Sequence, residues 1–450
     1  MRFSELEGAR VGVWGAGREI ASFAAQLARR LPAARIAVAV FDTPPAGAVA
    51  ELLGAPGVRV VTAAEAERAL SGCELLVRSP GVTIHRPEIE RLRAAGLPVT
   101  TATSLWLSER GGRGVLGVTG TKGKSTTAAL AHHLARSAGA DMHLAGNIGV
   151  PALDLLDAPA EEPAVVELSS YQIADLETAP ATAVVTNLYR EHLDWHGSEQ
   201  AYHEEKLRLL GLPGLRAAVL PTGFADPPQL EADVERRSFG DAGGWHLVET
   251  GIARGEDLRV PAERLPLPGD HNALNLCAAL AGLEAAAVPL PALPDGLDGF
   301  AGLPHRLQTV CDRDGVRWVD DSISTTPESA LAALASFAER PLVLIAGGQD
   351  RGQDYAALAA ELTRTNAALI ALPTTGPRLL EAALAAGLDP HRALAVEDMA
   401  SAVAAARARV PARGVVLLSP AAPSYDRYRD FEERGELFAA LARDASAMRR

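Results

Sequence analysis

The stretch Gly114–Leu130, GVLGVTGTKGKSTTAAL, carries the residues of a phosphate-binding loop. Glycines allow backbone N–H groups to converge on phosphate oxygens, and the N-terminus of a following helix adds favourable partial charge. Lys124 can reach the β- and γ-phosphates of a nucleotide, and the Ser125 hydroxyl can ligate magnesium. The general pattern GxxxxGK[ST] fails at Val118, but the stricter GTxGK[ST] is matched in full from Gly120. The strand pattern before the loop and the helical pattern after it favour nucleotide binding over a glycine turn that only caps a helix.

Two later segments carry acidic and histidine side chains. Glu167 ends a short apolar run, where a carboxylate could hold Mg²⁺ beside a nucleotide or could simply cap a turn. His192, Asp194 and His196 alternate in the segment REHLDWHG, either as metal ligands or as part of a surface turn. Because magnesium prefers oxygen ligands, we expect Glu167, phosphate oxygens and one histidine to bind it, rather than two histidines.

Further polar residues lie on two predicted helices. Lys206 lies on the helix predicted over Glu199–Leu209, where a solvated lysine paired with a neighbour such as Tyr202 is the usual arrangement. Asn272 and Asn275 lie one turn apart near the start of a later helix. Asn272 could cap that helix, or the two amides could grip a nucleotide base or a phosphate.

Short β-branched runs alternate with Ala-, Leu- and Arg-rich helical stretches along almost the whole chain. Such alternation predicts βαβ units and mainly parallel sheets, in which ligands bind beyond the carboxyl ends of the strands. The predicted strands are Arg10–Trp14, Arg35–Phe41, Glu74–Arg78, Gly114–Val118, Ala164–Glu167, Ala181–Asn187, Val316–Asp320, Pro341–Ala346, Ala367–Leu372 and Gly414–Leu418. The segment Gly211–Pro268 has weak strand signals, and we expect irregular structure or a small side sheet there.

Two breaks divide the chain. The segment Glu109–Arg113, ERGGR, is charged and rich in glycine, and Leu290–Gly299, LPALPDGLDG, has the composition of a linker. Domains typically have about 150 residues, so a chain of 450 residues is expected to have three. We therefore expect domains over residues 1–111, 112–298 and 299–450.

Composition limits the classes of partner. The chain has 56 acidic and 43 basic residues, and its formal net charge of -13 argues against nucleic acid and against an anionic membrane surface. Its apolar runs are too short to span a bilayer, and no secretory signal pattern opens it. Three isolated cysteines indicate neither a disulfide framework nor a zinc site, so we expect a reducing cytoplasm.

Motifs along nearly the whole chain resemble those of the Mur ligase family, the ATP-dependent enzymes that extend the peptide of the peptidoglycan precursor. These motifs are GVTGTKGKSTT, GNIGVP, ELSSYQ, NLYREHLDWHGSEQAYHEEKLRL, GDHNALN, FAGLPHRLQTV, VDDSISTT, IAGGQDRG and LSPAAPSYDRYRDFEERGELF. The resemblance implies an α/β chain of three domains. A Rossmann-like N-terminal domain would bind a UDP-sugar, a central P-loop ATPase domain with a parallel sheet would bind ATP, and a Rossmann-like C-terminal domain would close over the site. SPG at Ser79–Gly81, ELSSYQ and GLPHR look like the members that add glutamate to UDP-N-acetylmuramoyl-L-alanine.

The resemblance also implies roles for single residues. ATP would be bound by Gly120, Thr121, Lys122, Gly123, Lys124, Ser125, Thr126, Asn272, Arg306 and Asp321. The UDP-substrate would be bound by Gly15, Gly17, Asp42, Thr43, Ser79, Asn147 and Ser169. Magnesium would be held by Ser125, Glu167, His192 and Lys206, the last of these as a carbamate. Glutamate would be bound by Thr325, Arg351, Ser424 and Phe431, and the catalytic set would be Lys124, His192, Lys206 and Arg306.

The implied reaction has two steps. The L-alanyl carboxylate attacks the γ-phosphate of ATP to give an acyl phosphate and ADP, and the glutamate amine then displaces phosphate. Lys124, Arg306 and magnesium would neutralise the charge on the transferred group, and His192 is a candidate base for the amine. Lys124, Arg306 and Arg351 are expected to converge on one cleft. Such an enzyme would serve cell wall synthesis, and thereby cell shape and division, as a monomer in the cytoplasm.

The predicted glutamate pocket departs from the pattern of the D-glutamate enzymes. DSISTT stands where those enzymes have DSKATN, so Ile323 replaces a lysine and Thr326 an asparagine, and Arg351 stands for a lysine in the glycine turn. L-glutamate, with its amine in the same place, must direct its two carboxylates differently from D-glutamate, so the cationic residues that bind them should also lie elsewhere. The altered residues therefore favour L-glutamate as the substrate, with an epimerase acting downstream. The alternatives are a D-glutamate ligase of the same step, a folylpolyglutamate-synthase-like ligase and a nucleotide-dependent regulator. An NAD enzyme is the weakest of them, because Ile20 stands where a dinucleotide fingerprint has its third glycine.

Overall fold

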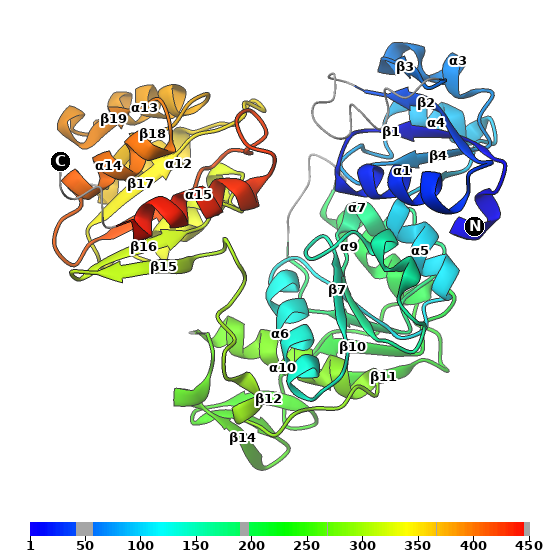
Figure 1. The fold of residues 1–450 in the computed structure, drawn as a ribbon. Helices are drawn as coiled ribbons and strands as arrows, with labels where there is room; N and C mark the ends of the chain where they lie inside the picture. Colours follow the sequence, from blue (N-terminus) through cyan, green and yellow to red (C-terminus); the bar gives the residue numbers. More distant parts are fainter. Residues whose placement is uncertain (42–56, 190–197, 268, 366, 445–450) are drawn as a thin grey trace. The chain divides into compact units, whose positions relative to one another are not determined.

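The alternating strands and helices form three sheets, each flanked by helices (Figure 1). The computed structural model describes residues 1–41, 57–189, 198–267, 269–365 and 367–444. The chain divides into two units, Met1–Phe300, which holds two of the sheets, and Ala301–Arg450, which holds the third. Within the described residues, no helix has the length and apolar character needed to cross a bilayer.

The first sheet has five strands, all paired in parallel. Its elements are β1 (Arg10–Trp14), α1 (Arg18–Arg30), β2 (Arg35–Val40), β3 (Arg59–Val61), α3 (Ala66–Leu70), β4 (Leu75–Arg78), α4 (Pro87–Ala94), β5 (Val99–Thr100) and α5 (Ala102–Arg110). The strand order is β3-β2-β1-β4-β5. Gly15 follows β1 with φ +99°, and a Cβ added there would lie 2.7 Å from the Cβ of Ser79 after β4. The loops after these neighbouring strands therefore touch each other.

The second sheet has nine strands. Its elements are β6 (Val115–Thr119), α6 (Lys124–Ser137), β7 (His143–Gly146), β8 (Ala164–Glu167), α7 (Ser170–Ile173), β9 (Thr182–Val185), α9 (Glu199–Leu207), β10 (Ala217–Pro221), β11 (Glu235–Phe239), β12 (Trp245–Val248), β13 (Gly251–Arg254), β14 (Asp257–Pro261) and α10 (Asp270–Ala285). The order is β14-β13-β12-β11-β10-β9-β6-β8-β7, parallel from β7 to β12 and antiparallel beyond.

The expectation for the segment Gly211–Pro268 is wrong. Its described part forms β10 to β14, and these strands extend the main sheet instead of forming irregular structure or a separate sheet. The reason lies in their composition, since β11 and β14 expose several polar residues and therefore lack the continuous apolar runs of the buried parallel strands.

Helices cover both faces of the second sheet. On one face, α6 and α10 pack with Leu130 and Leu276 buried, and each such leucine contributes about 1.5–3 kcal/mol. On the other face, Trp106 of α5 joins a single apolar cluster that also holds Phe23 of α1 and Val166 of β8. Because this cluster contains side chains from both sheets, the first unit has a continuous core between them.

The second unit has a six-stranded sheet. Its elements are β15 (Gln308–Arg313), β16 (Val316–Asp320), α11 (Pro327–Ala335), β17 (Leu342–Ala346), α12 (Ala356–Thr365), β18 (Ala368–Ala371), α13 (Gly376–Ala385), β19 (Ala393–Ala395), α14 (Met399–Arg409), β20 (Val415–Leu418) and α15 (Phe431–Arg443). The order is β15-β16-β20-β17-β18-β19, and only the β15–β16 pair of these described strands is antiparallel.

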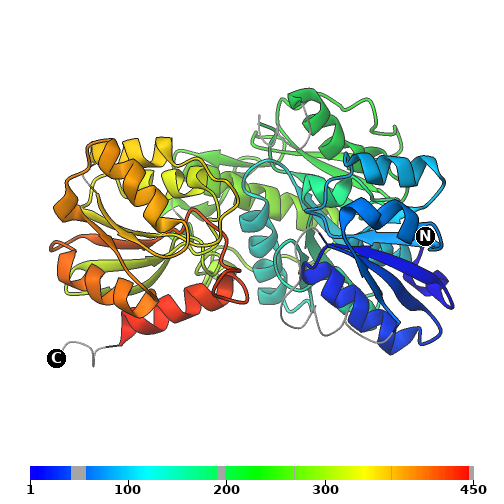
Figure 2. The same ribbon diagram turned by 90° about the horizontal axis from the view of Figure 1, so that it is seen from above.

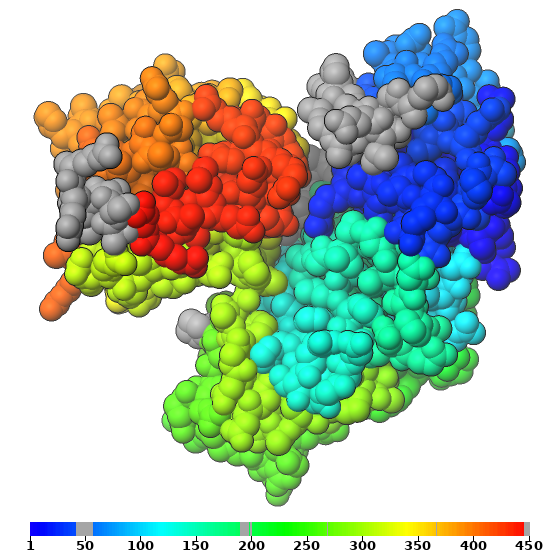
Figure 3. Space-filling model, viewed as in Figure 1, coloured from blue at the N-terminus to red at the C-terminus, as the bar shows by residue number. Residues whose placement is uncertain are grey.

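Both faces of this third sheet are covered as well (Figure 2). Leu334 of α11, Leu358 of α12 and Leu379 of α13 bury one face, and Val403 of α14 and Phe438 of α15 bury the other. Helix α15, red in Figure 3, lies at the surface of this unit. The carboxyl ends of β16, β20 and β17 are adjacent, so the loops that follow them share one edge of the sheet.

Candidate active site

The predicted phosphate-binding loop follows β6 and opens α6. Gly120 has φ +138° and Gly123 has φ +80°, conformations that favour glycine. A Cβ added at Gly123 would lie 2.1 Å from Oδ1 of Asn275, so this asparagine packs directly on the loop. The first N–H groups of α6 have no acceptor within the helix and are therefore available to phosphate oxygens.

The segment after β9 holds this loop in place. The backbone N–H of Thr121 donates to the carbonyl of Asn187 at 2.9 Å, and that of Lys122 donates to Oδ1 of Asn187 at 2.8 Å. The hydroxyl of Thr186 donates to the carbonyl of Lys122 at 2.6 Å. Sequence reasoning missed Thr186 and Asn187, although they directly follow a strand next to β6, where a ligand-site residue is expected.

The cationic and hydroxyl groups of the loop lie at the start of α6. Lys124 is half-buried, and its Nζ donates to the carbonyl of Thr121 at 2.8 Å. Ser125 and Thr126 are buried in the first turn. The loop therefore carries a shielded ammonium beside two hydroxyls, an arrangement suited to a phosphate chain and its metal ion.

Glu167 ends β8, the strand next to β6. Its side chain is 1% exposed; Oε1 accepts a hydrogen bond from Nδ2 of Asn147 at 3.3 Å, and Oε2 has no partner among the described residues. A buried carboxylate oxygen without a partner carries a large desolvation cost, which a bound cation would relieve. The predicted magnesium therefore fits this residue on physical grounds. His192 lies outside the described residues, and no group of three or more His, Cys, Asp or Glu within them is arranged to hold a metal ion.

Lys206 on α9 is buried, with 2% exposure, rather than solvated. Its Nζ lies 4.9 Å from the centroid of the Tyr202 ring, and the Tyr202 hydroxyl donates to Oγ1 of Thr121 at 3.1 Å. Helix α9 is thereby tied to the phosphate-binding loop. The sequence holds a signal for this: of 43 basic residues only Lys122, Lys124 and Lys206 are lysines, and all three belong to this region.

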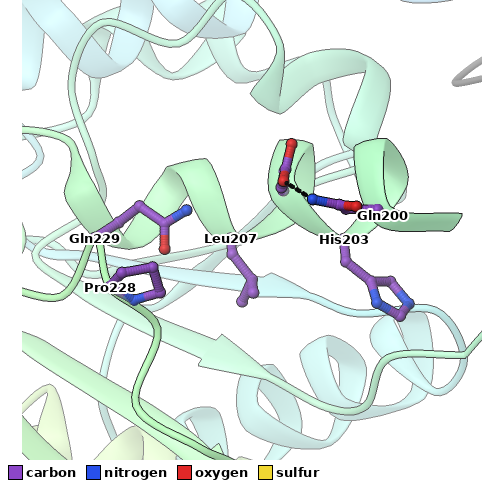
Figure 4. Close-up of a pocket in the computed structure, with 6 residues that line it drawn as sticks. Gln200, His203, Leu207, Pro228 and Gln229 are labelled. Carbon is purple, nitrogen blue, oxygen red and sulfur yellow. Dashed lines mark hydrogen bonds between the residues drawn. The ribbon is translucent and has the colours of Figure 1, made fainter. Parts of the chain in front are cut away.

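A hollow of about 670 Å³ lies against α9 (Figure 4). It is lined by Gln200, His203, Glu204, Leu207, Pro228 and Gln229. The helical residues among them repeat at intervals of three and four, and so form one face of α9, while Tyr202 and Lys206 belong to another face. None of these described lining residues is a predicted site residue.

The predicted UDP-binding residues come together in part. The N–H of Gly17 donates to Oγ of Ser79 at 3.2 Å, which joins the loops after β1 and β4. The Arg18 guanidinium donates to the carbonyls of Asn147 and Gly149, both at 3.1 Å, and so ties the first loop to the loop after β7. Asp42 and Thr43 lie outside the described residues.

Arg78, which sequence reasoning missed, organises the loop of Ser79. Its guanidinium is fully buried, pairs with the buried carboxylate of Asp175, and donates to the carbonyls of Pro80 at 3.0 Å, Val82 at 2.8 Å and Tyr171 at 2.7 Å. Burial lowers the pKa of Arg78, against the opposing effect of the Asp175 charge. One side chain thus fixes the loop that follows β4 and ties it to α7.

Glu19, at the start of α1, was missed as well. Burial raises the pKa of its carboxyl, and its Oε1 accepts a hydrogen bond from Nε2 of Gln172 at 2.7 Å. Oε1 of Gln172 in turn accepts from the hydroxyl of Ser169 at 3.0 Å and from its N–H at 2.9 Å. The predicted substrate residue Ser169 is therefore oriented by a chain of contacts that begins at Glu19 in α1.

In the second unit, Asp321 follows β16 and Arg306 precedes β15. Asp321 is buried, accepts from the hydroxyl of Ser419 at 2.7 Å and from the N–H of Leu307 at 3.2 Å, and has its pKa raised to about 6 by burial. Arg306 is exposed. The neighbouring His305 pairs with Asp320 at 2.7 Å; burial lowers its pKa, but this bond and nearby acids outweigh burial, so the net shift is upward.

The buried carboxyl of Asp321 gives a pH dependence of stability. Because its folded pKa lies above the ordinary value of 3.8, the folded protein keeps a proton that the unfolded chain releases, so stability falls from about pH 4 to about pH 6. In D321N this loss disappears, and the free energy of unfolding of the variant relative to the native chain rises by about 2–3 kcal/mol across that window. Urea unfolding monitored at several pH values measures this difference, and a constant difference would contradict the assignment.

The four residues predicted to bind glutamate follow β16, β17 and β20, whose carboxyl ends lie at one edge of the sheet. Ser424 is buried, Thr325 and Phe431 are half-buried, and Arg351 is exposed with its guanidinium carbon 5.9 Å from the centroid of the Tyr425 ring. Tyr425 was not predicted as a site residue. The two hydroxyls, the aromatic ring and the exposed cation therefore come from segments that follow three neighbouring strands.

Two family models match the chain, the Mur ligase middle domain at residues 118–283 and the Mur ligase, glutamate ligase domain at residues 305–422. A UDP-N-acetylmuramoyl-L-alanine--L-glutamate ligase of a Micromonospora species is 43% identical, covering 99% of this chain and 99% of the relative. The protein of the same name from Xanthomonas euvesicatoria pv. vesicatoria is 42% identical, covering 98% of this chain and 97% of the relative.

Solved structures share the fold. UDP-N-acetylmuramate-alanine ligase MurC from Thermotoga maritima matches with a TM-score of 0.57 at 18% identity, covering 96% of this chain and 98% of that one. MurF ligase from Thermotoga maritima in complex with ADP matches with a TM-score of 0.52 at 17% identity, covering 98% and 96%. With both family models matched and relatives above 40% identity along its length, the chain belongs to the Mur ligase family and has its three-domain α/β fold.

Proposed function

We propose that this chain is the ATP-dependent ligase that joins L-glutamate to the L-alanyl carboxylate of UDP-N-acetylmuramoyl-L-alanine in peptidoglycan precursor synthesis. The observation that carries the proposal is the likeness, over nearly the full length, to relatives named as L-glutamate ligases of this substrate. The phosphate-binding loop, the Glu167 oxygen that lacks a partner among the described residues, and the exposed Arg351 supply the chemistry that such a reaction needs.

The reaction proceeds in two steps, formation of an acyl phosphate and attack on it by the glutamate amine. A carboxylate oxygen of the alanyl group attacks the γ-phosphorus while the bond to the β,γ-bridging oxygen breaks, which releases ADP. The glutamate amine then attacks the acyl carbon, loses a proton, and inorganic phosphate leaves with the electron pair of the acyl–oxygen bond. Lys124 and Arg306 neutralise negative charge on the transferred phosphoryl group, and the N-terminus of α6 orients it.

Ser125, Glu167, His192 and Lys206 would hold magnesium. The ion, when bound, supplies charge stabilisation at the phosphate oxygens. We further propose that Lys206 carries a carbamate, which converts a buried amine into an anionic ligand. Addition of ¹³C-bicarbonate then gives a carbamate resonance that K206R lacks. A carbamate resonance that persists in K206R, or its absence from the native chain, would contradict the proposed carbamate.

Ile323, Thr326 and Arg351 support the choice of L-glutamate. Ile323 is half-buried and offers no charge, whereas Arg351 offers a planar, bidentate donor where the D-glutamate pattern has a lysine. The cationic anchors are therefore differently placed, as the mirror-image arrangement of the two carboxylates requires. An epimerase acting later would be needed if D-glutamate stands in the final peptide.

Coupled ADP release with each glutamate enantiomer tests the function. At saturating ATP and UDP-N-acetylmuramoyl-L-alanine, we expect L-glutamate to react at least about tenfold faster than D-glutamate, the discrimination that about 1.4 kcal/mol gives. Omission of the UDP-substrate serves as the control and should abolish the signal. Equal or faster turnover with D-glutamate would contradict the assignment of L-glutamate as the substrate. Turnover without the UDP-substrate would contradict the proposed ligase reaction.

The proposed organisation assigns one substrate to each domain. Residues 1–111 bind the UDP-sugar, residues 112–298 bind ATP, and residues 299–450 bind glutamate and contribute Arg306 and Asp321 to ATP binding. Lys124 belongs to the first unit, and Arg306 and Arg351 belong to the second. The proposed enzyme acts in the cytoplasm as a monomer.

A further inference from the structure

The loop between β20 and α15 carries an exposed aromatic ring beside Arg351, one of the residues proposed to bind glutamate. Tyr425 is 59% exposed, a large value for an aromatic side chain, and it follows the buried Ser424 directly. Its ring centroid lies 5.9 Å from the guanidinium carbon of Arg351, within the range of a cation–π contact. Tyr425 and Arg351 come from loops after two adjacent strands, β20 and β17.

These loops are joined into one surface. The N–H of Gln349 donates to the carbonyl of Pro423 at 2.8 Å, and a Cβ added at Gly348 would lie 2.3 Å from the same carbonyl. The buried Arg434 donates to the carbonyls of Ala422 at 3.1 Å and Ser322 at 2.8 Å. The backbone positions of the ring and of the cation are therefore fixed relative to each other.

The guanidinium of Arg351 has no acidic partner in the part of the chain that the structure describes. Among the described residues, no carboxylate forms an ion pair with its guanidinium, although Asp350 is its neighbour in sequence. The Asp350 carboxylate accepts two hydrogen bonds from the Arg378 guanidinium, at 2.8 and 3.0 Å. The N–H of Gly352 and this arginine lower the pKa of Asp350. Arg351 therefore keeps the paired N–H donors that suit a carboxylate from solution.

We propose that Tyr425 is a positioning residue of the amino-acid site. Its ring holds the guanidinium plane of Arg351 so that the edge of this plane receives a carboxylate of L-glutamate. This inference rests on the proposed function, because it names the group that recognises the acceptor amino acid. It assigns no role to the Tyr425 hydroxyl, since a cation–π contact uses the ring face.

Steady-state kinetics of Y425A and Y425F test this inference. In Y425A we expect the KM for L-glutamate to rise about three- to fivefold, the size of an exposed cation–π contact, while kcat and the KM values for ATP and the UDP-substrate stay within about twofold. Y425F should keep the native KM for L-glutamate. The matched control is L437A, an exposed aliphatic residue of the same unit at 41% exposure, which should change none of these values.

A double-mutant cycle with R351Q separates positioning from a general effect of the ring. In the R351Q background, Y425A should change the KM for L-glutamate by less than about twofold, because the cation that the ring holds is gone. An equal effect of Y425A in both backgrounds, or a loss in Y425F as large as in Y425A, would overturn the inference. Thermal melts of all variants establish folding. The native chain must first show L-glutamate-dependent ADP release; its absence would count against the proposed function rather than against Tyr425.

Discussion

Replacement of Lys124 by alanine is expected to lower kcat for ADP release by about 10²–10³-fold, a loss of about 3–4 kcal/mol of transition-state stabilisation. Lys124 lies at the first position of α6 and is half-buried, with its ammonium held by the carbonyl of Thr121 at 2.8 Å. Nothing else in this loop supplies a comparable cation from a shielded position, because Lys122 is exposed. Initial rates with all three substrates saturating measure the effect.

The matched control for this prediction is R136A. Arg136 lies near the other end of α6, half exposed and paired with Asp141, so its removal takes a cation from the same helix without touching the loop. Its rate should stay within about twofold of the native value, in line with the small effect of exposed ion pairs. If K124A retained more than about a tenth of the native rate, the phosphoryl group would not be bound by this loop.

The substitution D175N is expected to lower the free energy of unfolding by about 3–5 kcal/mol. Both side chains of the Arg78–Asp175 pair are fully buried, and Arg93 approaches the same carboxylate. Asparagine keeps the shape but removes the charge, so the guanidinium of Arg78 is left as an uncompensated buried cation. Chemical denaturation followed by fluorescence of the first unit measures the loss.

D257N is the matched control for a broken ion pair at the surface. Asp257 pairs with Arg259 at 3.2 Å, but the two side chains are 74% and 50% exposed. Its removal should change the free energy of unfolding by less than about 0.5 kcal/mol. A loss below about 1 kcal/mol in D175N would mean that the carbonyl partners of Arg78 alone stabilise its charge.

Local patterns predicted much of the fold. All ten predicted strands occur, and their ends agree with the structure to within about two residues, because buried parallel strands read as short apolar runs. The glycines of the phosphate-binding loop were also identified, because the backbone conformations that require glycine are set by the local sequence. The contact between Lys206 and Tyr202, one helical turn apart, was also within reach of sequence reasoning.

Contacts between distant segments were not predicted. Arg78 and Asp175 are separated by 97 residues, and Glu19 and Gln172 by 153. Each of these residues has a sequence environment typical of a surface charge or amide, and only the shared core of the two sheets buries them together. Tyr425 was missed for a related reason, because its partner Arg351 comes from a loop after a different strand.

The scarcity of lysine has a practical consequence for chemical labelling. Apart from the amino terminus of the chain, an amine-directed acylating reagent can react with three side chains, all in the proposed ATP-binding region: exposed Lys122, half-buried Lys124 and buried Lys206. Their reactivity should follow that order of access. Acylation of Lys122 and Lys124, located by peptide mapping, therefore reports on one loop.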